Sequence, residues 1–231
     1  MTLNDNKSKH MRFTNRKVSL NFIYNINGKT IETVTKHKHL GILYDNKLSF
    51  NDHCNDILHK SFSKFKFLKF ICRKTDCKTI LKLYKTYILP IIEFSCNCWV
   101  PNKTQSDLLE SIQRHITKYI CYKSNNNYLT YEQRLNILDL KSLKHRREIN
   151  ALKLVQKIKC NYNTIPINWF NYFQFYNTTR NGILIKKHMK RIEMFDNFYF
   201  NYCINLYNSL NIDFRNYNNY KDFVQYLCNN Y

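Results

Sequence analysis

The chain has few glycines and prolines, with 3 of each in 231 residues. Three scattered glycines cannot form a phosphate-binding loop of the G-x-x-x-x-G-K or G-x-G-x-x-G type. The G-x-S-x-G turn of nucleophilic hydrolases is also missing. No Asp-Asp pair occurs, and single glutamates such as Glu93, Glu110, Glu132 and Glu148 are scattered. We expect these glutamates on solvated helix faces, and we expect no catalysis within this chain.

Long apolar runs are missing as well. The best candidate for a membrane span, YILPIIEFSCNCWV, is interrupted by Pro90 and Glu93. The N-terminal MTLNDNKSKH lacks the apolar core of a signal peptide. The nine cysteines are odd in number and lack paired C-x₂-C spacing, so we expect reduced thiols and no structural zinc. These features predict an intracellular protein with no membrane partner.

Acidic residues are scarce relative to basic ones: 37 Lys and Arg oppose 16 Asp and Glu, which gives a net charge of +21. This excess favours a polyanionic partner, and nucleic acid first. An alternative stays open, because the abundant Asn, Lys, Ile, Tyr and Phe are also what A/T-rich codons specify. Since 44% of the residues are hydrophobic, composition alone excludes a disordered chain.

The first 45 residues have the short β-rich runs of strands. Asn27-Gly28 lies between two such runs and predicts a hairpin turn, because both turn positions need a positive φ. The stretch KHLGILYD at 38–45 resembles a strand with Gly41 in its interior. A glycine there indicates a bulge or the close approach of another backbone or a ligand.

From residue 50 onward the apolar period becomes helical. We expect an α+β fold that is mostly α, with a small β element at 1–48, a helical bundle at 49–160 and a looser tail at 161–231. Residues 124–130 are expected to form a loop and residues 161–190 an irregular, flexible linker. The predicted helices are 51–72, about 79–88 with a kink or end at Pro90, 106–121 with Leu108 on its buried face, 130–138, 140–159, about 192–210, and 220–227.

Basic residues gather on three helical faces. Lys60 and Lys64 lie on one side of the 51–72 helix, and Lys66, Phe67 and Phe70 also lie outside its apolar stripe. Lysines interleaved with aromatics suit phosphates and stacked bases. The alternative is a solvated lysine face whose phenylalanines pack on a neighbouring element, and both alternatives stay open. The other two faces carry Arg114 with Lys118, and the segment 144–147, including Arg146 and Arg147, with Lys153, Lys157 and Lys159.

The order of several motifs resembles the C-terminal part of reverse transcriptases from non-LTR retrotransposons. NDNKSKHMRF is similar to the family's N-x-x-K-[ST]-K segment, and KHLGILYDNKLSF to its Y-L-G-I-x-L-D block. LYKTYILPIIEFSCNCWVP resembles L-Y-x-x-Y-V-x-P-x-L-E-Y-x-x-x-V-W-x-P. LESIQRHITKYI, YEQRLNILDLKSLKHRR and the tail FNYCINLYNSLNI resemble further family segments in the same order.

The resemblance implies a primer-grip hairpin around Leu40 and Gly41, with Lys7 as the conspicuous lysine of the segment before it. The following helices would be the thumb, which contacts the phosphates of an RNA–DNA or DNA duplex. Lys60, Lys64 and Arg73 are then the leading contacts. The resemblance implies a location in the nucleus or the cytoplasm, within a retrotransposon ribonucleoprotein.

This sequence also departs from the family. The Y-x-D-D motif that holds catalytic Mg²⁺ in full-length members is missing, so the resemblance implies a palm and fingers before Met1 as partners, and no cofactor in this chain. In the tail, Tyr207 and Asn211 replace the family's Trp and Pro. Two alternatives stay open: an independent RNA-binding module that prefers single strands, which stack on Phe67 or Phe70, and a structural relic without a nucleic-acid role.

Overall fold

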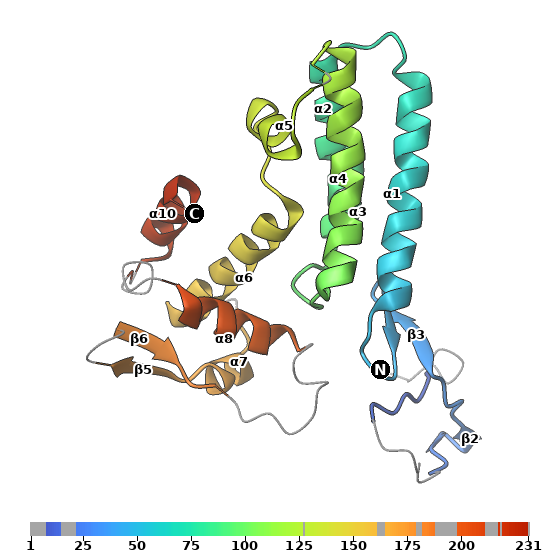
Figure 1. Ribbon diagram of the computed structural model, residues 1–231. Coiled ribbons are helices and arrows are strands. Elements are labelled where there is room, and N and C mark those ends of the chain that lie inside the picture. Colours follow the sequence, from blue (N-terminus) through green and yellow to red (C-terminus); the bar gives the residue numbers. More distant parts are fainter. Residues whose placement is uncertain are drawn as a thin grey trace. The chain divides into compact units, whose positions relative to one another are not determined.

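The computed structural model (Figure 1) has an α+β fold that is mostly helical, as predicted. The described residues are 8–14, 22–126, 128–160, 165–178, 182–187, 198–210, 217 and 219–230. The chain divides into two compact units, residues 1–57 and residues 58–231. The predicted boundaries at 48/49 and 160/161 stay predictions.

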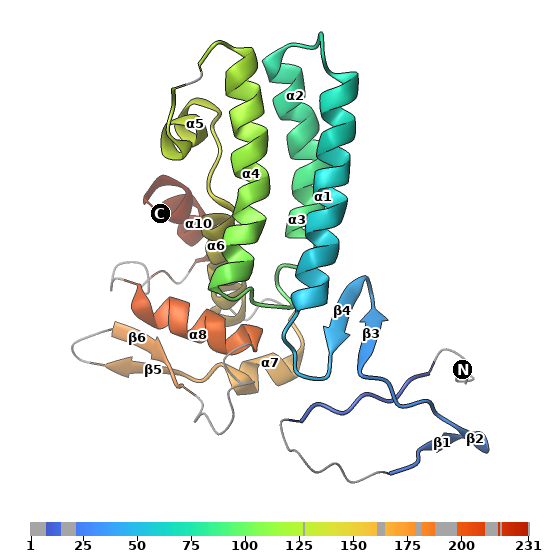
Figure 2. The same ribbon diagram turned by 45° about the vertical axis from the view of Figure 1, so that its right-hand side comes forward.

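Two short hairpins form the β part of the first unit (Figure 2). Strands β1 (Asn25–Ile26) and β2 (Lys29–Thr30) are joined by Asn27 and Gly28, whose φ angles are 51° and 78°. These values confirm the predicted turn.

Strands β3 (Lys36–His39) and β4 (Ile42–Asp45) pair antiparallel, with His39 opposite Ile42. Leu40 and Gly41 are the two turn residues between them, with φ angles of 48° and 87°. The prediction that Gly41 lies inside a strand is therefore wrong. In this structure Gly41 adopts the positive φ that a two-residue hairpin turn requires.

The Asp45 carboxylate fixes the passage from β4 into the first helix. It accepts hydrogen bonds from the backbone N–H groups of Lys47, Ser49 and Phe50 and from the Ser49 hydroxyl, at 2.9–3.1 Å. Burial tends to raise the pKa of Asp45, but these donors outweigh it and leave the pKa below its ordinary value. The small core beside this turn consists of Ile42, Phe50, Cys54 and Ile57.

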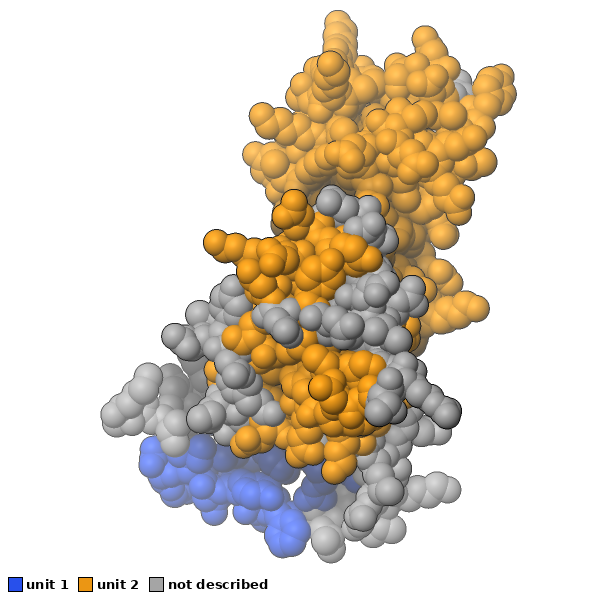
Figure 3. Space-filling model, turned by 90° about the vertical axis from the view of Figure 1, so that its left-hand side faces the viewer, with its two compact units in different colours: residues 1–57 blue, residues 58–231 orange. Residues whose placement is uncertain are grey.

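Residues 58–231 form the second unit, which is orange in Figure 3. Helix α1 (Asn51–Ile71) enters it from the first unit, and most of the predicted helices occur with ends shifted by a few residues. Leu108 is a correction, because it is exposed instead of buried. The other helices up to residue 160 are α2 (Cys77–Leu83), α3 (Leu89–Glu93), α4 (Lys103–Lys123), α5 (Tyr131–Ile137) and α6 (Leu143–Lys159).

A π-helical turn, η2 (Tyr84–Ile88), connects α2 to α3. The Leu89 N–H donates to the Tyr84 carbonyl, five residues back, directly before Pro90, which has no N–H to donate. The helical run therefore passes Pro90 and ends at Glu93, later than predicted.

Helices α1 and α4 lie side by side and run in the same direction (Figures 1 and 2). Phe62 contacts His115 and Phe65 contacts Tyr119, with ring centroids 5.5 and 5.9 Å apart. Buried apolar residues of α2, η2, α3 and α4 form the core of this bundle: Ile80, Tyr84, Ile88, Ile92, Leu109, Ile112, Ile116 and Ile120.

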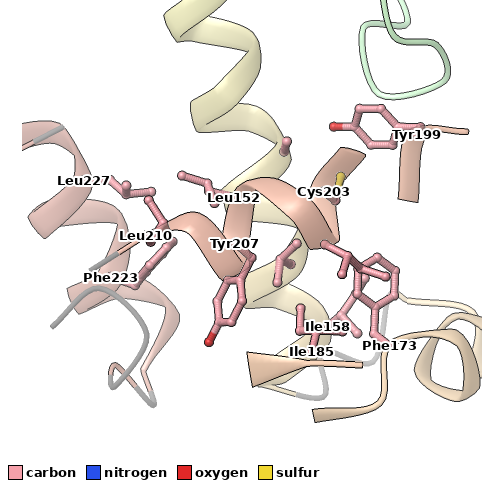
Figure 4. Close-up of a cluster of buried hydrophobic side chains, with 13 residues drawn as sticks. Leu152, Ile158, Phe173, Ile185, Tyr199, Cys203, Tyr207, Leu210, Phe223 and Leu227 are labelled. Carbon is pink, nitrogen blue, oxygen red and sulfur yellow. The ribbon is translucent and has the colours of Figure 1, made fainter. Parts of the chain in front are cut away.

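A second cluster of buried side chains surrounds the C-terminal half of α6 (Figure 4). Phe173 and Ile185 belong to it, so the prediction of an irregular linker over 161–190 is wrong in the described part. Tyr207 is fully buried here. The elements after α6 are α7 (Ile167–Tyr172), β5 (Phe175–Thr178), β6 (Gly182–Ile185), α8 (Tyr199–Ser209) and α10 (Tyr220–Asn230).

None of the helices in the described ranges is long and apolar enough to cross a membrane. Those cysteines whose side chains the structure describes are free thiols.

Candidate nucleic-acid interface

A basic and aromatic groove lies between the C-terminal ends of α1 and α4. Its cavity volume is about 440 Å³. We call it the α1–α4 groove. One wall comes from α1 and the turn after it, and the other from α4, with the lining residues Lys66, Lys69, Phe70, Arg73, Tyr119, Tyr122 and Lys123.

The helical periodicity of the two helices explains this lining. Leu68 of α1 and Cys72 directly after it are buried in the core, which leaves Lys69 and Phe70 on the flank of the helix. On α4, Ile116 and Ile120 are buried in the same way. The rings and cations between them therefore face the groove.

Cation–π contacts organise the walls. The Arg73 guanidinium lies 5.1 Å from the ring centroid of Phe70, and Lys69 Nζ lies 5.5 Å from that of Tyr119. Burial raises the pKa of the Tyr119 hydroxyl, so this group stays a neutral donor at pH 7.

Lys123 joins the two walls. Its Nζ donates to the carbonyls of Cys72, Arg73 and Thr75 at 2.9, 3.1 and 2.6 Å. These carbonyls belong to the turn that directly follows α1, where the chain no longer has helical N–H groups to bond them. The ends of α1 and α4 are thereby held together.

The groove lies in a strongly cationic part of the second unit. Among its described lining residues none is acidic. The sequence from 60 to 74 contains no Asp or Glu, and neither does the part of α4 from 111 to 123. Like charges held this close repel one another, and a bound polyanion relieves the repulsion. The cations of the two stretches are Lys60, Lys64, Lys66, Lys69, Arg73, Lys74, Arg114, Lys118 and Lys123.

The residues predicted to bind nucleic acid lie at several separate places in the structure. Lys66 and Arg73 line the groove. Lys60 and Lys64 are exposed on another side of α1, at the spacing of one turn. Lys118 is exposed on α4, one turn before Tyr122.

Arg114 is exposed on α4, and its guanidinium lies 5.3 Å from the ring centroid of Tyr131 in α5. At the tip of the β3–β4 hairpin, Leu40 is 81% exposed, next to Gly41. Lys7 lies outside the described residues.

Arg147 is a correction to the predicted basic face of α6, because it is buried in the protein, and the half-exposed Arg146 of the same face is held in an ion pair. Arg146 forms a two-bond ion pair with Glu93, with Nη2 donating to Oε2 at 2.9 Å and Nε donating to Oε1. Arg147 is only 7% exposed, and it donates to the Ile92 carbonyl and lies over the Trp99 ring. These contacts hold α6 against α3 and the turn that follows α3.

The remaining cations of α6 are partly engaged as well. Lys159 donates to the Tyr217 carbonyl at 2.8 Å, and burial lowers its pKa. Lys157 Nζ lies 5.5 Å from the ring centroid of Tyr220. The candidate interface is therefore on α1 and α4 instead of α6.

Three of the glutamates expected on solvated faces have partners instead, and one of them, Glu148, is 3.9 Å from Lys144 with its side chain 18% exposed. Glu93 pairs with Arg146, as described above. Glu110 is only 6% exposed. It accepts hydrogen bonds from the N–H groups of Leu143 and Lys144 at the start of α6, and from the Tyr131 hydroxyl.

Other cavities in the described residues are less suited to a polyanion. One of about 310 Å³ between the start of α4, the start of α6 and α8 contains Lys103, Lys144 and Arg147, but also Asp107. In the first unit, Lys9, Phe13, His37, His39 and Tyr44 line a smaller one with Met11. The described residues contain no group of three or more His, Cys, Asp or Glu side chains able to hold a metal ion.

Sequence reasoning missed Lys69, Tyr119, Tyr122 and Lys123. A signal for three of them was present, because Tyr119, Tyr122 and Lys123 recur at three- and four-residue spacing beside the apolar stripe of α4.

Comparison with curated proteins finds similarity to a protein of Caenorhabditis elegans described as uncharacterized. The two are 28% identical over 120 residues, which is 52% of this chain and 61% of that protein. The match thus spans less than two thirds of the relative's length. No protein-family model matches the chain. No solved structure matches it.

Proposed function

We propose that this chain is the downstream part of a non-LTR reverse transcriptase and that it binds primer–template duplex through phosphates. The observation that carries the proposal is the cationic surface of α1 and α4, where two stretches without a single carboxylate lie side by side. A thumb must hold a duplex of any sequence, and phosphate contacts do this because they carry no sequence information.

Two further features support the proposal. The family motifs run in order along nearly the whole chain. The segment that matches the primer grip forms a hairpin with an exposed tip at Leu40 and Gly41. Since the sequence carries no Y-x-D-D motif, the proposal assigns duplex binding to this chain and no nucleotidyl transfer.

The test is the salt dependence of binding to an RNA–DNA hybrid, measured by fluorescence anisotropy. Each phosphate contact steepens the plot of log K against log salt concentration by about 0.9. Lys66→Gln with Lys69→Gln changes the groove side of α1, and Lys60→Gln with Lys64→Gln changes the other side. We expect at least one pair to flatten the slope by about 1.8, with equal effects on hybrids of different sequence.

The matched control is Lys78→Gln with Lys82→Gln, which removes the same charge from exposed positions on α2. Its slope should equal that of the unchanged protein. Two results would contradict the proposal: no hybrid binding at about 150 mM salt, which is the behaviour expected of a structural relic, or slopes that change as much in the control as in the α1 pairs.

A further inference from the structure

Two aromatic rings stand exposed on opposite walls of the α1–α4 groove. Phe70 of α1 is 65% exposed and Tyr122 of α4 is 66% exposed. Exposed large aromatics that lie close together commonly mark a binding surface. A duplex that is bound only through its phosphates makes no contact that requires these rings.

On each wall of the groove, a cation lies beside the aromatic rings. Arg73 covers Phe70, and Lys69 covers Tyr119, which also packs nearly perpendicular to the ring of Phe65. Lys66 completes the α1 side. A ligand with both a flat face and a negative charge matches this arrangement, because rings stack on flat faces while the cations bind the charge.

We propose that the α1–α4 groove binds unpaired nucleotides of a strand that continues beyond the duplex. This inference rests on the proposed function and adds a second ligand class to the same surface. Bases stack on Tyr122 and Phe70, and the phosphates between them contact Lys66, Lys69 and Arg73. Bases inside a duplex are stacked on each other, so only unpaired ones can do this.

The fixed width of the groove favours such a ligand. Lys123 holds the end of α1 through three carbonyls, so the walls are already positioned before a strand enters. The rings can stack on any base, because every base has a flat face. The cations can neutralise any strand, because every linkage carries a phosphate. Binding should therefore tolerate all sequences.

The experiment compares a blunt RNA–DNA hybrid with the same hybrid carrying a short single-stranded extension of the RNA. The test variant is Phe70→Leu with Tyr122→Leu, which keeps apolar side chains but removes both flat faces. The control is Phe22→Leu with Tyr87→Leu, one Phe and one Tyr of similar exposure, at positions that do not line the groove. Circular dichroism confirms that all variants are folded.

The extension should tighten binding by the unchanged protein by at least about fivefold, which is the lower end of base–aromatic stacking. The groove variant should lose this gain and keep the blunt-hybrid affinity and salt slope, while the control keeps the gain. A gain that is missing in the unchanged protein, or that survives in the groove variant, overturns the inference.

Failure of the proposed function has a different signature. In that case the unchanged protein does not bind the blunt hybrid. If binding of a free single strand still depends on Phe70 and Tyr122 in that case, the inference stands and the duplex role falls.

Discussion

Replacing Glu110 with alanine should strongly destabilise the second unit. The carboxylate is buried between α4, α5 and the start of α6, where it accepts from Leu143 N–H at 3.0 Å and Lys144 N–H at 3.3 Å. The Tyr131 hydroxyl is its third donor. Burial and the nearby Glu110 charge raise the pKa of Tyr131, so this hydroxyl keeps its proton at neutral pH.

The magnitude follows from what the alanine leaves behind. A hydrogen bond to a charged group contributes about 1.5–3 kcal/mol, and a buried donor without a partner costs about 1–3 kcal/mol. The positive end of α6 also loses a favourable charge worth about 0.3–1 kcal/mol. Since the donors partly regain water, we expect Glu110→Ala to lower the free energy of unfolding by about 3–5 kcal/mol. Glu110→Gln keeps one acceptor oxygen and should cost less, about 1–2 kcal/mol.

Urea unfolding followed by circular dichroism measures these differences, and the thermal midpoint should fall on the order of 10 °C for the alanine variant. Glu132→Ala is the matched control, because Glu132 is exposed on α5 and its loss should change stability by less than about 0.5 kcal/mol. If Glu110→Ala proves as stable as this control, the hydrogen bonds assigned to Glu110 do not stabilise the fold.

Three further predictions concern other positions. The pKa of Asp45 is lower in the fold than its ordinary value of 3.8, so the stabilisation that Asp45 provides is complete above pH 3.8 and is lost as the pH falls through the folded pKa. Hydrogen exchange of residues 22–57 should therefore show opening at acid pH, and this pH dependence should be weaker in Asp45→Asn. Gly41→Ala places a side chain at φ 87° and should cost about 1–2 kcal/mol, with Gly41→Asn costing less, and equal stability of both with the parent would argue against the hairpin turn. Arg146→Lys replaces a two-bond contact to Glu93 with a single one, and we expect urea unfolding to show a loss of about 1–2 kcal/mol in the free energy of unfolding. Adding Glu93→Gln to this variant should cause little further loss, and fully additive losses would contradict the ion pair.

The helices were the most predictable part of the fold, because their signals are local. Asn102 and Thr130 each accept from the residue three positions on, and Gln105 and Gln133 return the bond, so the start of α4 and of α5 is encoded within four residues. The 51–72 helix likewise followed from its own apolar spacing.

The tail could not be predicted in the same way. Strand β5 is rich in polar and aromatic residues, β6 is a short apolar run after a glycine, and neither shows a clear period. Their burial comes from contacts with α6 and α8, as with Ile185, whose N–H donates to the side chain of Asn208. Gly41 was misplaced for a local reason, because Leu40 is an unusual residue at positive φ and continues the apolar run of the strand.

Each wall of the candidate site has a signal in the sequence, but the pairing of the two walls has none. Lys66 follows from the pattern of α1, and Arg73 was named as what the family resemblance implies. Tyr122 and Lys123 come from a helix about fifty residues later, and no local pattern reports that the two helices are parallel neighbours. The ion pair of Arg146 gave no local signal because its partner, Glu93, is 53 residues away in the sequence.

The π-helical turn at Tyr84–Ile88 makes the length of this segment more important than its composition. The turn accommodates one residue more than an α-helical turn, and Lys85 and Thr86 are exposed members of it. Deleting either one would restore regular α-helical bonding but rotate α2 by about 100° relative to α3, since an α-helix has 3.6 residues per turn. Ile80 would then turn away from the core. Substitutions are therefore tolerable at these two positions, whereas a one-residue gap is not.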